Sequence, residues 1–357
     1  MFFAANNIST PDENSAAANS FKTKQHLSGS KFLRLLFGIK NIFLFVIFFL
    51  VILFNSKATS KGCLSFVPYG WNDFYVHLPQ NASFCVEQGN SSYKYKTDNY
   101  GGRIFSNEPF NDKIQVFGDS QVVGLDIEKI QEHYLSNIYK NHNFIIYAAP
   151  NNGPYEVINF LTKNKKILKK KIVITFNFAV DIYRISNSWH PTKFVALKDY
   201  ELEEILDHPF KYRLIIFKNF LFNKNFTLKK YNNQKMQNLF LSSNQDEIYE
   251  NLSKYFYELD QFANTNNLQI DFIVTHPYWL YSRSKKNNNL VLENKLNKKV
   301  YQLICKSFKE TKNIDKILLS KPSVNFSFKD LTFDKRHIKS KKIQLLVRKE
   351  ACKDHEY

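Results

Sequence analysis

The stretch Lys113-Ile-Gln-Val-Phe-Gly-Asp-Ser120 decides the fold. Its first five residues form a short apolar run typical of a buried strand, and Gly118-Asp-Ser then interrupts the run. A serine directly after such a strand, preceded by Gly-Asp, lies on a tight turn that presents its hydroxyl at the edge of a sheet. The backbone N–H of Ser120 points into the same space. The stretch therefore predicts a sheet with a candidate nucleophile at its edge.

Further along the chain, apolar runs alternate with segments of helical spacing. Strands are predicted at 143–147, 171–176 and 268–275. Helices are predicted at 127–135, 155–170, 291–312 and 340–352, with a long helix-rich segment at about 182–262. This alternation indicates βαβ units and a parallel sheet.

Reacting groups in such sheets gather outside the carboxyl ends of the strands. The residues expected there are Ser120, the turn 149–154, Asn177 and His276. The segment Phe333-Asp334-Lys-Arg-His337 near the C-terminus adds a candidate base. An Asp three residues before a His can reach the imidazole Nδ1 and fix its tautomer. A serine hydroxyl needs such a base because its own pKa is too high for attack at neutral pH. The alternatives are a plain turn serine and a solvated Asp–His pair.

These two blocks, at opposite ends of an α/β pattern, resemble the SGNH (GDSL-type) hydrolase superfamily over about residues 98–347. The resemblance implies an α/β three-layer sandwich with a mainly parallel, flavodoxin-like sheet. It implies that Ser120 is the nucleophile, His337 the base and Asp334 the residue that orients the base. Asp98-Asn-Tyr-Gly-Gly-Arg103 is similar to the Asn-x-x-Gly-x-Arg lead-in of many anchored members, with Asp98 in place of the first Asn.

The resemblance also implies donors for the oxyanion. One is the N–H of Ser120. The segment Tyr147–Tyr155 is similar to the family's second block, and there the family's oxyanion glycine falls on Asn151, with Gly153 two residues later. In the third block Val180 stands where the family has an Asn, and Asn177 is the candidate substitute. Losing one donor costs roughly 2.7–4 kcal/mol of transition-state stabilisation. Either Asn177 serves, or the site is slow or inactive.

The N-terminal part predicts a membrane anchor. Residues 1–30 are polar and read as a disordered cytoplasmic tail, and residues 31–56 contain the wholly apolar run Ile42–Phe54. Extended back to Leu36, the run is about long enough to span a ~30 Å hydrocarbon core. The alternatives are a cleaved signal peptide and a buried core helix. Lysines and arginines are more frequent before the run than after it, so the rest of the chain is expected to be exported. A lead-in segment at 57–110 precedes the SGNH-like domain at 111–357.

The positions of the cysteines and the net charge limit the possible functions further. Cys63 and Cys85 are able to form a disulfide in an oxidising compartment, whereas Cys305 and Cys352 are either a second bridge or two buried thiols. The net charge of +18 comes largely from lysines spread among asparagines, without nucleic-acid-binding motifs, so no nucleic-acid partner is expected. Nine histidines and four cysteines without short paired spacing predict neither a metal site nor a cofactor.

The leading hypothesis is a membrane-anchored serine ester hydrolase or O-acyltransferase that acts on carbohydrate or lipid esters of the envelope or an exopolysaccharide. Its partners would be the lipid bilayer and that ester-bearing substrate. The second hypothesis is a catalytically degenerate protein of the same fold that binds or assembles envelope glycans. A third is a membrane protein without any site.

Overall fold

The computed structural model describes the following parts of the chain: residues 63–64, 67–72, 75–88, 91–105, 113–140, 142–150, 152–177, 181–182, 184–185, 206–207, 245–275, 302–308, 311–322, 328–332 and 338–347. All belong to one compact unit, Lys61–Tyr357. The tail expected at 1–30 and the anchor expected at 31–56 lie outside them. In the parts described, no helix is both long and apolar enough to cross a membrane.

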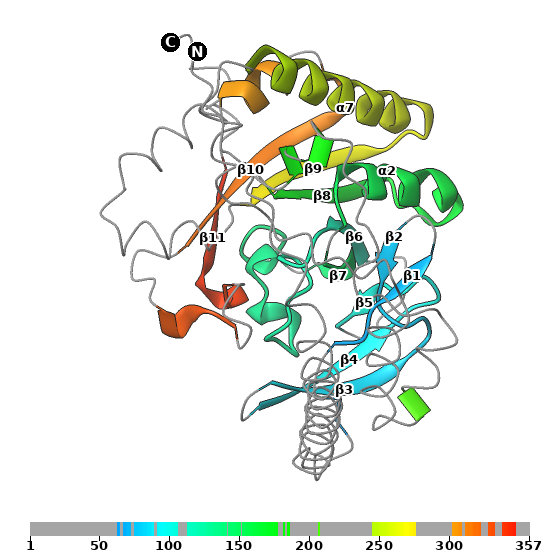
Figure 1. Cartoon of the computed structure of the whole chain (residues 1–357), viewed down its shortest axis with the longest axis vertical. Coiled ribbons are helices and arrows are strands. Elements are labelled where there is room, and N and C mark those ends of the chain that lie inside the picture. Colours follow the sequence, from blue (N-terminus) through cyan, green and yellow to red (C-terminus); the bar gives the residue numbers. More distant parts are fainter. Residues whose placement is uncertain are drawn as a thin grey trace, which may run out of the picture. The chain divides into compact units, whose positions relative to one another are not determined.

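The fold is mixed α/β and is built on a nine-stranded sheet (Figure 1). In spatial order the strands are β11 (Ile343–Val347), β10 (Ile314–Pro322), β9 (Gln269–Thr275), β8 (Lys171–Asn177), β6 (Lys113–Gly118), β7 (Asn143–Ala148), β5 (Arg103–Ile104), β4 (Ser91–Thr97) and β3 (Ser83–Gln88). The five strands from β10 to β7 run parallel, and antiparallel strands extend the sheet on both sides.

The parallel core predicted from the sequence is therefore confirmed, and the order of its strands locates the site. In chain order the five parallel strands lie 2-1-3-4-5, so the chain moves one way from β6 to β7 and the other way to β8. In open α/β sheets ligands bind outside the carboxyl ends of the strands where the order reverses. Here that point lies between β6 and β8, and Ser120 follows β6.

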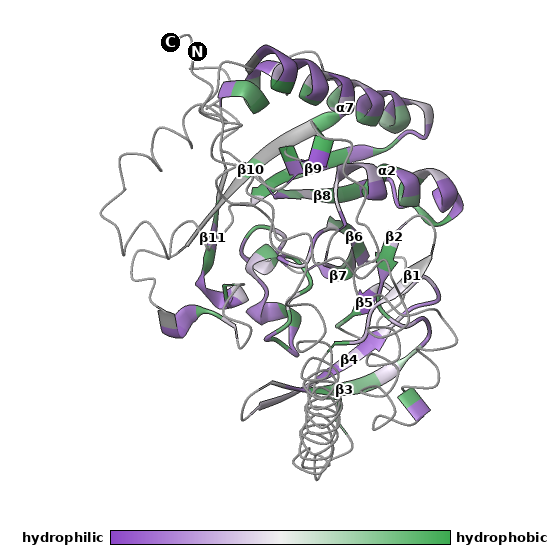
Figure 2. Ribbon diagram, in the orientation of Figure 1, coloured by the Kyte–Doolittle hydropathy of each residue, from purple (hydrophilic) through white to green (hydrophobic). Residues whose placement is uncertain are grey.

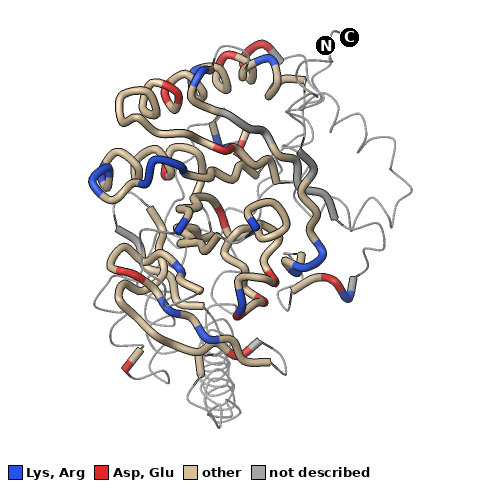
Figure 3. Tube along the Cα trace, turned by 180° about the vertical axis from the view of Figure 1, so that it is seen from behind, with Lys and Arg blue, Asp and Glu red and all other residues tan. Residues whose placement is uncertain are grey.

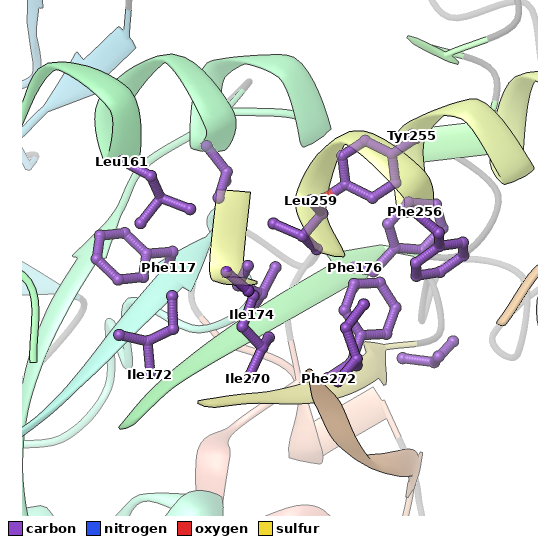
Figure 4. Packing of buried hydrophobic residues seen from close by; sticks show 14 of the residues in the cluster. Phe117, Leu161, Ile172, Ile174, Phe176, Tyr255, Phe256, Leu259, Ile270 and Phe272 are labelled. Atoms are coloured by element: carbon purple, nitrogen blue, oxygen red, sulfur yellow. The ribbon is translucent and has the colours of Figure 1, made fainter. Parts of the chain in front are cut away.

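One face of the sheet is covered by α2 (Pro154–Lys163) and α7 (Gln245–Thr265). Figure 4 shows side chains of both helices, Leu161 on α2 and Tyr255, Phe256 and Leu259 on α7, packed over apolar residues of the strands. The strand β8 is buried along nearly its whole length and is apolar at its centre, whereas both helices also carry a polar side in Figure 2.

The opposite face is covered by short 3-10 turns rather than by the helix predicted at 127–135. These turns are η3 (Ile130–Glu132) and η4 (Tyr134–Asn137), and their apolar residues join Val116 and Val173 of the sheet in a second buried cluster. The helix prediction was wrong because His133 between the turns has extended backbone angles. Its imidazole Nδ1 accepts the N–H of Leu135 and so caps η4.

The C-terminal predictions also need correction. Where a helix is expected at 340–352, residues 340–347 instead form a 3-10 turn, η8 (Ser340–Lys342), and β11, which pairs antiparallel with β10, and residues 348–352 lie outside the described residues. Of the helix expected at 291–312, residues 302–308 are helical, but 311–313 are not and β10 begins at Ile314. The helix expected at 155–170 ends at Lys163, and the 3-10 turn η5 (Lys165–Ile167) follows. Within the expected helical insertion at 182–262, α7 begins at Gln245.

The lead-in segment supplies β3, β4 and β5, and its strands β1 (Gly70–Asn72) and β2 (Tyr75–His77) form a separate antiparallel pair. A disulfide joins Cys63 to Cys85 of β3, as the sequence allowed. Cys305 is also disulfide-bonded, and Cys352 lies outside the described residues.

Candidate functional site

The turn that carries Ser120 is closed by its neighbour Asp119. The buried Asp119 carboxylate accepts the N–H of Gln121 at 2.9 Å through Oδ1, and its carbonyl accepts the N–H of Val122 at 3.3 Å. Ser120 between them is partly exposed. A Cβ at Gly118 would lie 1.7 Å from Thr175 Oγ1, so only glycine fits between β6 and β8 where the turn begins. The sequence thus fixes the turn through Gly118 and Asp119.

The loop after Ser120 is held by Arg103 from the lead-in. Its guanidinium donates to the carbonyls of Val123, at 2.9 Å, Gly124 and Ile127. It also lies over the rings of Tyr95, 3.9 Å from the centroid, and Phe105. Burial lowers the pKa of Arg103. The arginine of the lead-in motif therefore shapes the loop that follows the serine, a role that the motif alone did not reveal.

A buried histidine supports the same loop. His133 Nδ1 accepts the N–H of Leu135 at 3.2 Å, which leaves Nε2–H to donate to the carbonyl of Val122 at 3.0 Å. Burial lowers the pKa of this imidazole to about 3, so it is neutral at physiological pH. His133 is a structural residue, and nothing in the sequence distinguished it from the other histidines.

At the end of β8, Asn177 lies against the serine turn. Its side-chain Nδ2 donates to Asp119 Oδ2 at 2.8 Å, and its backbone N–H donates to Asp181 Oδ2 at 2.6 Å. The side-chain Oδ1 of Asn177 is buried and has no hydrogen-bond partner. The structure therefore places Asn177 beside the turn of Ser120, where one hydrogen of its amide group donates to the Asp119 carboxylate. Val180 lies outside the described residues.

In the second block, Gly153 begins α2. Its N–H donates to Glu156 Oε2 at 3.0 Å, so that N–H is engaged within the protein. Asn151 lies outside the described residues. The sequence reasoning overlooked Asn152, whose side chain accepts the N–H of Val76 and donates to its carbonyl, both at 2.8 Å. Asn152 thereby attaches the turn after β7 to β2.

Asp181 and Arg184 were also overlooked. Both side chains are buried, and Arg184 Nη1 donates to Asp181 Oδ1 and to the carbonyl of Asn152, each at 2.8 Å. Burial raises the pKa of Asp181 to about 7, as does nearby Asp119, while Arg184 and the N–H of Asn177 oppose the shift. The sequence did contain a signal for this pair. Asp181 and Arg184 are three residues apart and follow a predicted strand, where functional side chains are expected.

Asp334 and His337 lie outside the described residues, but the residues on either side of their segment are described. Leu331 and Ile338 form an antiparallel bridge, and both belong to the buried cluster that contains Val122 and Val123. The N–H of Ser340 donates to Asp126 Oδ1 at 3.3 Å. Both ends of the segment 333–337 therefore meet beside the loop that follows Ser120. His276 lies outside the described residues too.

Across the described parts of the chain, no group of three or more His, Cys, Asp or Glu is arranged to hold a metal ion. Comparison with models of protein families and with curated protein sequences finds no match to this chain.

Proposed function

We propose that this chain is a membrane-anchored serine ester hydrolase or O-acyltransferase of the SGNH type, acting on ester-bearing glycans or lipids of the cell envelope. The observation that carries the proposal is the position of Ser120. It stands at the carboxyl end of β6, at the switch point of the sheet, and the Leu331–Ile338 bridge joins both ends of the segment with Asp334 and His337 beside the following loop.

The order of the parallel strands supports the finer assignment of the fold. The order 2-1-3-4-5 is that of flavodoxin-like sheets, which the family resemblance implies. Arg103 supports it as well, because the lead-in motif of the resemblance supplies the side chain that holds the loop after the serine.

In the proposed reaction, Ser120 Oγ attacks the ester carbonyl while His337 takes the hydroxyl proton. Asp334 orients the imidazole and stabilises its charged form. The tetrahedral intermediate collapses, the leaving alcohol receives the proton from His337, and the acyl group remains on Ser120. Water or a sugar hydroxyl, deprotonated by His337, then attacks this acyl-enzyme and restores the serine. Water gives hydrolysis, and the sugar hydroxyl gives transfer.

The disulfide between Cys63 and Cys85 supports an exported domain, since disulfides persist in oxidising compartments. The anchor at 31–56, with the N-terminus in the cytoplasm, would place this domain at the outer face of the membrane. The net charge of +18 suits an anionic envelope or an anionic polymer.

A specific observation favours the second candidate, a degenerate protein that binds glycans. Two of the expected oxyanion donors already make bonds within the protein: Gly153 N–H donates to Glu156, and one of the two Nδ2 hydrogens of Asn177 donates to Asp119. The N–H of Ser120 and that of Asn151 are the remaining expected donors.

The test is labelling of the detergent-solubilised full chain with a fluorophosphonate, which reacts with activated serines. We expect wild type to be labelled, Ser120→Ala to be unlabelled, and His337→Ala and Asp334→Ala to react at least 100-fold more slowly. Ser136→Ala is the matched control because the Ser136 hydroxyl donates to the carbonyl of Ile130, a nearby residue of the same segment. A folded wild-type protein without labelling would leave the binding protein as the better description.

A further inference from the structure

A continuous series of polar contacts crosses the carboxyl edge of the sheet. It starts at the carbonyl of Asn152, passes through Arg184 and Asp181, and reaches the backbone of Asn177. From there the side chain of Asn177 leads to Asp119, and Asp119 accepts the N–H of Gln121. The series therefore joins the turns that follow β6, β7 and β8. It ends on the two residues that flank Ser120.

The surrounding structure is shaped around Arg184. A Cβ at Gly153 would lie 2.8 Å from Arg184 Cδ and 3.0 Å from Glu156 Oε2, so the absence of a side chain at this position lets the arginine reach the second block. Gly153 has an extended backbone that any residue adopts, and its φ is −114°. Glycine is needed there for space and not for conformation.

We propose that Asp181 and Arg184 are positioning residues that hold the turn of Ser120 in register with the turn of the second block, and that this hold weakens when Asp181 takes up a proton. As a regulation of the same site, this inference rests on the proposed function. Neither residue needs to touch the substrate. Each acts through the backbone groups that it binds, Arg184 through the carbonyl of Asn152 and Asp181 through the N–H of Asn177.

The charge state of Asp181 decides how many bonds it accepts. As a carboxylate it accepts the N–H of Asn177 and a guanidinium N–H of Arg184 on separate oxygens. A protonated carboxyl has one acceptor oxygen replaced by a donor, so at least one of these contacts weakens. The groups that face Asp181 are Arg184 on its own segment, Asp119 on the turn after β6, and the buried Tyr255 of α7. Burial raises the pKa of Asp181 to about 7, so the change falls within the range of physiological pH.

Amide hydrogen exchange of the full chain tests this coupling without relying on catalysis. Arg184→Met is expected to lower the protection factors of the Gln121 and Asn177 amides at least 10-fold and the rate of fluorophosphonate labelling about 10-fold. Arg184→Lys keeps the charge and is expected to restore part of both. Lys171→Met is the matched control. It removes the partner of another buried aspartate, Asp271, and is expected to leave the protection at Gln121 unchanged.

The pH dependence provides a second readout, one that remains if Arg184→Met fails to fold. In wild type, protection of Gln121, corrected for intrinsic exchange, is expected to fall as the pH decreases from 8 to 6. In Asp181→Asn the dependence should be absent. Persistence of the pH dependence in Asp181→Asn, or an effect of the Arg184 variants confined to residues 181–185, would overturn the proposal.

The same exchange measurements in a Ser120→Ala background separate the two proposals. If amide protection at Gln121 depends on Arg184 but wild type is not labelled, the enzymatic function is excluded and the positioning role of Asp181 and Arg184 stands. Labelling that depends on Ser120 but is indifferent to Arg184 would keep the enzyme and remove the positioning role.

Discussion

Both edges of the parallel sheet bury an aspartate beside a cation, yet the two arrangements differ. At the carboxyl edge both oxygens of Asp181 are bonded, and its partner Arg184 is buried as well. At the amino edge Asp271 Oδ2 accepts a hydrogen bond from Tyr139 OH and lies 3.2 Å from Lys171 Nζ. The Oδ1 atom of Asp271 is buried without a hydrogen-bond partner. The side chain of Lys171 is 41% exposed.

The comparison separates a network from a local contact. The Asp181 contacts continue into the turns after β6 and β7, whereas Asp271 contacts Tyr139 and Lys171, the first residue of β8. Lys171 follows the lysine-rich segment between α2 and β8 that is blue in Figure 3. A buried ion pair costs desolvation and is retained where its geometry is useful. We therefore expect changes at the carboxyl edge to have larger effects than matched changes at the amino edge.

The largest effect is expected for Arg103→Met. The substitution removes the guanidinium donor of three buried carbonyls, those of Val123, Gly124 and Ile127, and only the Gly124 carbonyl has another donor among the bonds described, the N–H of Ile127 at 3.4 Å. Since an unsatisfied buried group costs about 1–3 kcal/mol, the free energy of unfolding should fall by about 4 kcal/mol or more. Chemical denaturation measures it. Lys94→Met, at an exposed position on the neighbouring strand β4, is the control and should change stability by less than about 0.5 kcal/mol.

The next effect concerns pH. The folded-state pKa of Asp181 lies above its unfolded value, so its contribution to stability is complete below about pH 4 and is lost as the pH rises to about 7. The unfolding free energy of wild type, relative to that of Asp181→Asn, should therefore fall by about 2–4 kcal/mol as the pH rises from 4 to 7 and stay constant above that. A constant difference from pH 4 to 8 would contradict the raised pKa. The two signs differ because unfolding exposes Asp181 to water, whereas the local opening proposed above leaves it buried without the Asn177 N–H, which raises its pKa further and is therefore favoured by protonation.

An intermediate effect is expected for Gly118→Ala. The new methyl group would collide with Thr175 Oγ1 at the base of the serine turn, and overpacking of this kind costs about 1–3 kcal/mol. Calorimetry should show a lower melting temperature. The double variant Gly118→Ala, Thr175→Ala should recover part of the loss because the colliding oxygen is removed. If the single variant is as stable as wild type, the close approach of β6 and β8 is not as described.

The sequence predicted the features that depend on local pattern. The runs that form β6, β7, β8 and β9 are mainly apolar, although β6 contains Gln115 and β9 contains Asp271, and such mainly apolar runs predict buried strands. β10 and β11 were not predicted as strands; β10 pairs in parallel with β9, and β11 pairs antiparallel with β10, and neither pairing is visible in the local sequence. The helix predicted at 127–135 is likewise absent because the His133 side chain caps a 3-10 turn, and hydrophobic periodicity cannot predict such a bond.

At the candidate site, the sequence led to Ser120 and Asn177 but not to the residues that position them. Arg184, Asp181 and Asn152 act through backbone groups of segments far apart in the chain, and only the fold brings these together. Nothing in their local sequence carries that information except their place at strand ends. Positioning residues are therefore harder to predict than the nucleophile, which has a motif of its own.

The smallest effect is expected for Lys171→Met, the change that tests the comparison most directly. The partly exposed lysine is screened by water, and Tyr139 OH still donates to Asp271 after it is removed. Pairs of this kind contribute about 0.2–1 kcal/mol, so stability should fall by no more than that, and 1 M salt should remove most of the difference. Arg184→Met should destabilise the protein more than this and show little salt dependence, because both of its partners are buried. Equal losses for the two variants would mean that the carboxyl edge is no more tightly organised than the amino edge, and the comparison would fail.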